Sequence, residues 1–195
     1  MNMSHDPIAL FAEWYARASS VAGIDKPHAM TLATEAGSRP SARIVLLSSF
    51  DERGFVFHTN YESRKGRELE ANARVALVFW WDPLGYQVRI EGTARKTAPA
   101  ESDAYFARRP RGSQLGAWAS DQSRVIPEYA VLETRMQALE REYAGRPVPR
   151  PPHWGGYRVT PEVIEFWEHR DNRLHERVRY VRDPAGAWRV ERLAP

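Results

Sequence analysis

The fold of this chain is decided by residues 29–94, AMTLATEAGSRPSARIVLLSSFDERGFVFHTNYESRKGRELEANARVALVFWWDPLGYQVRIEGTA. Runs rich in β-branched and aromatic residues alternate there with turn signals, and they cover residues 30–34, 42–48, 55–59, 75–81 and 86–94. Strands this close, joined by hairpin-length gaps, predict an antiparallel sheet or barrel. One stretch, residues 63–72, instead reads as a short helix with Ser63 near its N-cap.

The flanking segments add helices and more strands. Asp6-Pro7 is a helix-start pattern, and Phe11, Trp14 and Ala18 follow at helical spacing, which predicts an N-terminal helix within residues 1–23. Residues 99–144 form a helical segment, with helices predicted at 99–108 and 127–144. Residues 154–195 return to strands, at 157–160, 163–168, 176–182 and 188–193. We therefore expect one domain over residues 1–195, of α+β class and mostly β: a small antiparallel β-barrel of eight or nine strands with peripheral helices.

The composition narrows the functional class. The chain has 195 residues, a net charge of +3 and no cysteine, which excludes disulfides, thiolate metal sites and cysteine nucleophiles. No histidine pair has H-x-x-x-H spacing, and no P-loop, G-x-G-x-x-G or G-x-S-x-G motif occurs, so we expect no metal site. The small net charge does not predict a nucleic-acid partner. Without a signal peptide or a run of about 20 apolar residues, we expect a cytoplasmic protein with no membrane association.

Two short motifs are candidates for binding an anionic or flat ligand. Ser63-Arg64-Lys65 begins a predicted helix, where free N–H groups and two cations favour an anion such as phosphate, and Arg43 could add a further positive charge. Gln87 lies on the strand face opposite Val88, where an amide could bond a heterocycle. A solvated helix start, a charge at the barrel rim and a solvent-facing strand are the structural alternatives.

Two longer segments carry more functional side chains. In YFARRPRGSQLGAWASDQS (105–123), arginines and interleaved aromatics could bind phosphate or an RNA backbone, or form only a charged connector between helices. In EFWEHRDNRLHER (165–177), we expect Arg173, His175 and Arg177 to share one face of a strand. Two cations that flank an imidazole are unfavourable without an anionic partner, so this segment indicates a functional site.

Taken together, these segments resemble the pyridoxamine 5′-phosphate oxidase family. The matching stretches follow the family's order from about residue 29 to residue 195, and they are RIVLLS, FVFHTNYESRKGREL, QVRIEG, YFARRPRGSQLGAWAS-DQS, the WGGYRV–EFW pair, RLHER and the final RLAP. The resemblance implies an FMN-binding split β-barrel. It also implies a homodimer that holds FMN in clefts at the subunit interface.

The resemblance implies site residues position by position. The implied FMN contacts are Arg43, Ile44, Val45, Leu46, Leu47, His58, Thr59, Arg64, Lys65, Gln87, Gln122, Ser123, Trp167 and Arg177. The implied substrate contacts are Ser48, Tyr105, Arg109, Ser113, Arg173, Leu174 and His175. Among them, Tyr105, Arg109 and Ser113 would bind the substrate phosphate. Arg173 and His175, the catalytic candidates, would lie over the pyridine ring. Positive charge near the flavin would favour its reduced, anionic form.

The implied reaction is an oxidation of pyridoxine or pyridoxamine 5′-phosphate to pyridoxal 5′-phosphate. A hydride passes from the substrate C4′ carbon to flavin N5, and O2 reoxidises the flavin to give H2O2. The small-molecule substrate and O2 are the expected partners, besides a second copy of the chain.

The sequence departs from the family pattern at substrate-facing positions. Ser48 stands where the vitamin oxidases have a lysine that contacts the substrate phosphate, and His58 replaces the usual tyrosine. The basic N-terminal arm is expected to be missing, because the chain begins almost at the first helix.

These departures keep two alternatives open. The flavin oxidases of phenazine biosynthesis also lack this lysine, and they act on a reduced, non-phosphorylated heterocycle. A non-catalytic barrel that binds RNA or stores flavin is the other alternative. The phosphate contacts Tyr105, Arg109 and Ser113 are retained, which favours a phosphorylated substrate.

Overall fold

The computed structural model describes residues 5–195, in which eight strands and five α-helices follow one another along the chain. Their bounds are α1 Pro7–Ser20, β1 Ala29–Ala36, β2 Arg39–Asp51, β3 Gly54–Asn60, α2 Arg64–Ala71, β4 Arg74–Trp81, β5 Tyr86–Lys96, α3 Pro99–Ala107, α4 Arg111–Ala119, α5 Ala130–Glu142, β6 Trp154–Glu168, β7 Glu176–Arg182 and β8 Trp188–Leu193. Short 3₁₀ turns, Asp82–Leu84 and Asp171–Arg173, follow β4 and β6.

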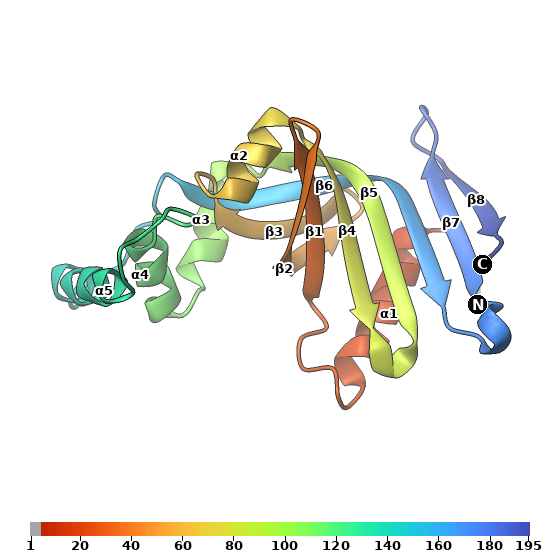
Figure 1. The fold of residues 1–195 in the computed structure, drawn as a ribbon, viewed down its shortest axis with the longest axis horizontal. Helices are drawn as coiled ribbons and strands as arrows, with labels where there is room; N and C mark the ends of the chain where they lie inside the picture. Colours follow the sequence, from red (N-terminus) through yellow and green to blue (C-terminus); the bar gives the residue numbers. More distant parts are fainter. Residues whose placement is uncertain (1–4) are drawn as a thin grey trace.

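The strands form an antiparallel barrel, as the sequence predicts. Their order in the sheet is β3-β2-β1-β4-β5-β6-β7-β8, and an additional pairing of β3 with β6 closes the first six strands into a ring. Phe57 lies opposite Tyr157 in that closing pair. The last two strands continue the sheet beyond the ring and lie at the right of Figure 1. The fold is therefore mostly β, with a closed six-stranded barrel and a two-stranded extension.

The N-terminal helix packs into the core of the barrel. Asp6 caps α1 by accepting the N–H of Ile8, and Phe11, Trp14 and Ala18 are buried, as their spacing predicts. The ring of Trp14 stacks on Tyr86 with 3.9 Å between ring centroids. The predicted 1–23 segment thus contains a helix, although residues 1–4 lie outside the described part of the chain.

Helices α3, α4 and α5 form an arm that extends from one end of the barrel, at the left of Figure 1. Phe106, Leu115, Val148 and Trp154 form a second hydrophobic cluster that joins α3 and α4 to the start of β6. Val148, in the proline-rich residues 146–153, is buried in this cluster and packs against the arm.

Three local sequence predictions were wrong. Residues 111–119 form helix α4, where no helix was predicted. The predicted strands 157–160 and 163–168 are one continuous strand, because β6 pairs with β3 along its first half and with β7 along its second. Arg173 and His175 precede β7 in a turn, so they do not share a strand face with Arg177. None of the helices within residues 5–195 is long and apolar enough to cross a membrane.

Candidate functional site

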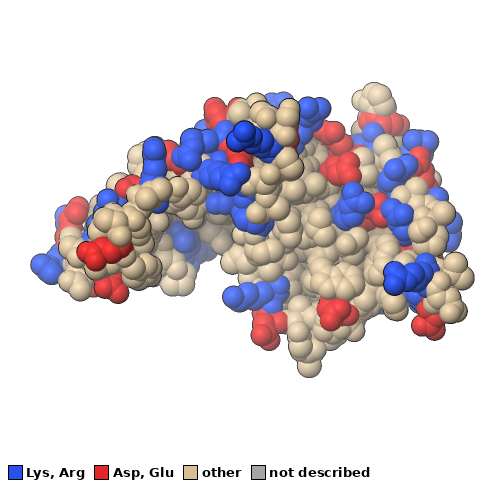
Figure 2. Space-filling model, in the orientation of Figure 1, with Lys and Arg blue, Asp and Glu red and all other residues tan. Residues whose placement is uncertain are grey.

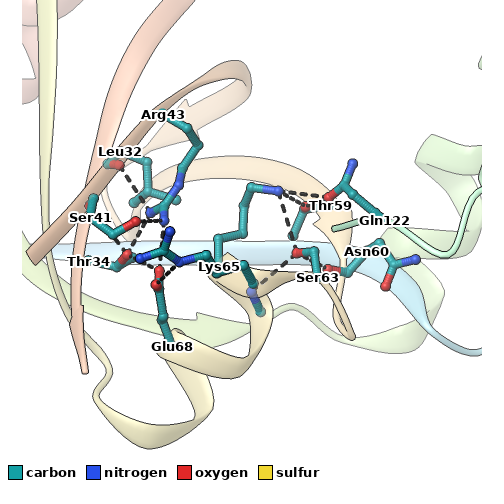
Figure 3. Close-up of polar contacts among 12 residues, drawn as sticks. Leu32, Thr34, Ser41, Arg43, Thr59, Asn60, Ser63, Lys65, Glu68 and Gln122 are labelled. Atoms are coloured by element: carbon teal, nitrogen blue, oxygen red, sulfur yellow. Dashed lines mark hydrogen bonds and ion pairs between the residues drawn. The ribbon is translucent and has the colours of Figure 1, made fainter. Parts of the chain in front are cut away.

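The start of α2 is built as an anion-binding corner. Ser63 caps the helix, since its hydroxyl accepts the N–H of Gly66 at 3.2 Å. Gly66 is required there, because a Cβ at this position would lie 1.9 Å from the carbonyl oxygen of Tyr61. Lys65 Nζ donates to Gln122 Oε1 at 2.7 Å and to Thr59 Oγ1 at 3.2 Å. The helix start, β3 and the loop after α4 thus meet at one lysine (Figure 3).

Two arginines reach the same corner through a shared carboxylate. Glu68 accepts from Arg43 at 2.7 Å and from Arg64 at 2.8 Å, and Thr34 also donates to it at 2.6 Å (Figure 3). Burial alone would raise the pKa of Glu68, but these hydrogen bonds outweigh it and hold the pKa below its usual range. Burial and the charge of Arg43 lower the pKa of Lys65. Three cations, Arg43, Arg64 and Lys65, and one carboxylate leave a local excess of positive charge at this corner. In Figure 2, blue atoms gather over α2.

A cavity of about 220 Å³ lies beside this corner, between α4, the end of β3 and the start of β6. Arg109, Ser113 and Gln122 are among the residues that line it. The Arg109 guanidinium lies 4.5 Å from the ring centroid of Trp154, a cation–π contact. Its NH1 is buried and has no hydrogen-bond partner among residues 5–195. Burial lowers the pKa of Arg109, and the neighbouring phenol of Tyr105 acts in the opposite sense. A buried, unpaired guanidinium donor is costly, which indicates a site for an anion.

Ser48 and His58, the two departures from the family pattern, contact each other. His58 Nδ1 lies 3.1 Å from Ser48 Oγ, and Ser48 donates to the carbonyl of Val56 at 3.0 Å. The His58 ring stacks on Tyr105 at 3.8 Å between centroids, with an angle of 6° between the planes. Burial, together with the charges of Arg109 and Arg108, lowers the pKa of His58 to about 4. This histidine is therefore neutral at physiological pH.

A second group of predicted residues lies in one register row across the outer face of the sheet. Gln87 pairs with Trp80 on one side and with Trp167 on the other, and Trp167 pairs with Arg177. Arg177 is held by the buried carboxylate of Glu165 at 2.8 Å. The row presents an amide, two indoles and a guanidinium, which is a surface suited to a flat polar ring.

Arg173, Leu174 and His175 lie in the turn next to that row. Asn172 and Arg173 both have positive φ angles, 57° and 60°, and Leu174 is 70% exposed. The His175 ring lies 4.4 Å from Trp167, and its Nδ1 accepts the N–H of Arg170 at 3.2 Å. Desolvation, followed by the charges of His169 and Arg173, lowers the pKa of His175. Strained backbone that presents two polar side chains is typical of a functional turn.

The predicted site residues thus fall into two clusters. We call Thr59, Lys65, Arg109, Ser113 and Gln122 the helix-side cluster. We call Gln87, Trp167, Arg173, His175 and Arg177 the strand-side cluster. They lie at opposite ends of β6, whose 15 residues give a path of roughly 50 Å at about 3.3 Å per residue. Figure 1 shows the start of β6 beside the arm and its end beside β7.

The remaining predicted FMN contacts lie in β2 and in the loop after α4. Ile44 and Leu46 are 64% and 49% exposed on the outer face of β2, while Val45 and Leu47 are buried in the core. Because the side chains of Val45 and Leu47 point into the core, these two residues could contact a ligand outside the barrel only through their backbone. Ser123 follows Gln122 with a positive φ of 73°.

Sequence reasoning missed the two buried carboxylates of the site. Glu68 orients Arg43 and Arg64, and Glu165 orients Arg177. A signal was present for Glu68, since it lies four residues after Arg64, the spacing of a helical ion pair. Glu165 gave no local signal, because its partner comes from a neighbouring strand. Within residues 5–195, no group of three or more His, Cys, Asp or Glu side chains could hold a metal ion.

Comparison with known proteins assigns the family. Residues 18–141 match the model described as pyridoxamine 5′-phosphate oxidase, and residues 154–195 match the one described as the pyridoxine 5′-phosphate oxidase C-terminal dimerisation region. The chain belongs to the pyridoxamine 5′-phosphate oxidase family and is an oxidase with the split-barrel fold.

Several relatives align over nearly the whole chain. The pyridoxine/pyridoxamine 5′-phosphate oxidase of Rubrobacter xylanophilus is 61% identical over 97% of this chain and 87% of its own length. The one of Burkholderia lata is 54% identical over 100% of this chain and 91% of its own length. The crystal structure of PhzG from Burkholderia lata, in complex with tetrahydrophenazine-1-carboxylic acid, matches with a TM-score of 0.93 and 35% identity, covering 100% of this chain and 95% of that one.

Proposed function

We propose that this protein is an FMN-dependent oxidase that converts pyridoxine or pyridoxamine 5′-phosphate to pyridoxal 5′-phosphate, with O2 as acceptor and H2O2 as second product. The observation that carries the proposal is Arg109, whose buried NH1 has no partner among the described residues and which lines a cavity with Ser113. A phosphate ester is the ligand that such a donor set suits best.

The residues of the α2 corner fit the phosphate of FMN. Arg43, Arg64 and Lys65 oppose one carboxylate, Glu68, so that the corner can accept a dianion without further counter-charge. Bound FMN would supply an isoalloxazine ring that accepts two electrons from substrate. On the strand-side cluster, Gln87 would donate to the polar edge of that ring.

One chain cannot provide both clusters to the same flavin, because they lie at opposite ends of β6. We infer that the helix-side cluster of one protomer and the strand-side cluster of its partner form each site. Four of the five residues of the strand-side cluster lie between the end of β6 and the start of β7, within residues 154–195, which match the family's dimerisation region. Ile44, Leu46 and Trp80 are large apolar side chains exposed on the outer sheet face, and a second copy would cover them.

In this arrangement Tyr105, Arg109 and Ser113 bind the substrate phosphate, while Arg173 and His175 of the partner orient the pyridine ring. His175 Nδ1 already accepts the N–H of Arg170, so the neutral ring carries its proton on Nε2 and donates from there. Oxidation removes a hydride from C4′ and a proton from the alcohol of the substrate. The amine substrate reacts in the same sense, and water then replaces its nitrogen, which leaves as ammonia.

A second candidate is the oxidation of a reduced heterocycle that carries a carboxylate. Two observations favour it. Ser48 adds no positive charge to the cavity lined by Arg109 and Ser113, which we call the anion pocket, and the chain is similar to PhzG. The identities favour the phosphorylated substrate, since the chain is 54% identical to the pyridoxine/pyridoxamine 5′-phosphate oxidase of Burkholderia lata and 35% identical to PhzG of that organism.

Steady-state kinetics of FMN-loaded variants test the proposal. We expect Arg109→Ala and Arg173→Ala each to lower kcat/KM for pyridoxine 5′-phosphate at least tenfold, with FMN still bound. Arg111→Ala is the matched control, because Arg111 is exposed and its guanidinium donates, within residues 5–195, to the carbonyls of Tyr143 and Arg146. Unchanged kcat/KM in both site variants contradicts the assignment. A wild-type protein inactive on phosphate esters but active on a reduced tricyclic carboxylate favours the second candidate.

A further inference from the structure

Ser48 occupies an irregular position in the barrel that explains its hydrogen bonding. The pairing of β2 with β3 shifts register between Leu47 and Ser49, which makes Ser48 the extra residue of a β-bulge. A bulge interrupts the backbone ladder at this point. The Ser48 hydroxyl donates to the carbonyl of Val56 at 3.0 Å and so satisfies an acceptor beside the interruption.

This bond determines which nitrogen of His58 carries the proton. The Ser48 hydroxyl has one hydrogen and gives it to Val56, so at 3.1 Å it can only accept from His58 Nδ1. The neutral ring therefore carries no hydrogen on Nε2. That nitrogen is buried near Gly156 and Thr97 and has no hydrogen-bond partner among the described residues. The Ser48 hydroxyl is thus committed to the protein and is not free to donate to a ligand.

The orientation of the His58 ring is passed on to the anion pocket through stacked rings. The His58 ring lies against Tyr105 on one side, at 3.8 Å, and 5.2 Å from Trp154. Trp154 in turn lies 4.5 Å from the guanidinium of Arg109. Tyr105 lies in the last turn of α3, and Arg109 follows the helix with its N–H bonded to the carbonyl of Phe106, so a rotation of the imidazole would displace both expected anion contacts.

We propose that Ser48, His58 and Tyr105 form a neutral positioning unit, in which Ser48 fixes the His58 ring and the His58 ring holds Tyr105 beside Arg109 of the anion pocket. His58 and Ser48 are thus positioning residues for binding of the substrate phosphate, and neither contacts it. The role of the pocket rests on the proposed function, whereas the geometry of the unit does not.

A double-mutant cycle separates positioning from direct contact. The probe is pyridoxal 5′-phosphate, titrated into FMN-loaded protein, with wild type, Ser48→Ala, Tyr105→Phe and the double variant compared. We expect Ser48→Ala to weaken binding about fivefold in the wild-type background and less than twofold in the Tyr105→Phe background, because Ser48 acts through the phenol. If the fold-losses in affinity of the two single variants multiply in the double variant, Ser48 and Tyr105 act independently. That result overturns the proposal, since it indicates that Ser48 contacts the phosphate itself.

Two replacements of His58 separate its two contacts. His58→Phe keeps an aromatic ring against Tyr105 but lacks the Nδ1 donor, and His58→Asn keeps a donor for Ser48 but lacks the ring. Because the unit requires both, we expect each variant to lose at least threefold in affinity for pyridoxal 5′-phosphate while affinity for FMN changes less than twofold. Wild-type affinity in both variants contradicts the proposal.

A readout without substrate keeps this proposal independent of the proposed function. In ¹⁵N-labelled protein we expect His58 as the Nδ1–H tautomer, with ring protons shifted upfield by the Tyr105 stack. Ser48→Ala should abolish the tautomer preference and reduce that upfield shift. A protein that shows both signatures but does not bind pyridoxal 5′-phosphate contradicts the proposed function and leaves the unit intact. A wild-type Nε2–H tautomer contradicts the unit itself.

Discussion

Two buried carboxylates, Glu68 and Glu165, determine where the arginines of the site point. Each accepts from two arginines, and each lies where a lone carboxylate would be unfavourable. The two arginines bound to each carboxylate are therefore held in one geometry. His58 shows the opposite arrangement, a half-buried ring that its surroundings keep neutral. At the scale of single residues, the site combines arginines whose direction is fixed by buried carboxylates with the neutral ring of His58.

The depressed pKa of His58 predicts a pH dependence of stability. In the unfolded chain this histidine takes up a proton below its usual pKa of 6.5, but in the folded protein it does so only near pH 4. Stability from this group is therefore complete above pH 6.5 and is lost as the pH falls toward 4. After a discount for partial exposure, we expect a loss of about 1–2 kcal/mol.

Urea unfolding of wild type and His58→Phe between pH 7.5 and pH 4.5 measures this loss. Other groups also titrate in this range, so the difference between the two proteins is the informative quantity. The stability of the variant should fall less steeply than that of wild type. Parallel curves would mean that His58 is protonated equally in both states.

Lysine at position 48 is predicted to have little benefit by itself. Ser48→Lys removes the hydroxyl that pairs with Val56 and His58, so we expect a loss of about 1–3 kcal/mol in stability, because two buried polar groups are left unpaired. With His58→Tyr added, the charge should become available to the pocket and affinity for pyridoxal 5′-phosphate should rise about tenfold. Calorimetric titration of both variants checks this. A full gain from Ser48→Lys alone would show that the two positions are independent.

Helix α2 is the element that carries the anion corner, and its position depends on one close approach. Gly66 lies against the carbonyl of Tyr61, where a Cβ would approach within 1.9 Å. Gly66→Ala should therefore displace the helix start, lower stability by about 1–3 kcal/mol and weaken FMN binding. Gly112→Ala is the control, since an added Cβ there would meet no atom of the described residues within 4 Å, apart from its chain neighbours and its own helix backbone. Thermal unfolding and FMN titration distinguish the two, and equal behaviour would contradict this account of α2.

The helices and strands differ in how well they could be predicted from sequence patterns. The barrel strands, α1 and the α2 corner could be predicted because alternation, helical spacing and capping are local signals. Helix α4 was missed because two glycines and three polar or charged residues obscure the spacing of its two buried residues, Leu115 and Ala119. The turn that presents Arg173 was read as strand, because its positive φ angles occur at residues other than glycine. The residue sets of the site came from family resemblance, whereas their separation into two clusters required the structure.

At the scale of the whole molecule, the barrel keeps the helix-side and strand-side clusters apart. Closure of the barrel by β3 and β6 places the arm at one end of β6 and leaves the β7–β8 extension at the other (Figure 1). The helix-side and strand-side clusters therefore cannot meet within one protomer. A twofold dimer would bring them together twice, with two identical sites.

Complementation between defective chains tests this arrangement. One chain carries Arg109→Ala and a differently tagged chain carries Arg173→Ala, and the doubly tagged dimer is purified. If each site takes Arg109 from one protomer and Arg173 from its partner, one site of the mixed dimer is intact. We expect about half of the wild-type activity per dimer, against nearly none for either parent. A mixed dimer as inactive as its parents would place both residues in one chain's site.

The most direct test of the central claim is an anaerobic one. Pyridoxine 5′-phosphate is added to the FMN-loaded protein without O2, and the visible absorption of the flavin is followed. Our account predicts that the yellow colour is lost as two electrons pass from substrate to flavin, and that it returns with H2O2 when air is admitted. A protein that holds FMN, binds the substrate and stays yellow would contradict the proposed oxidation of vitamin B6 phosphates.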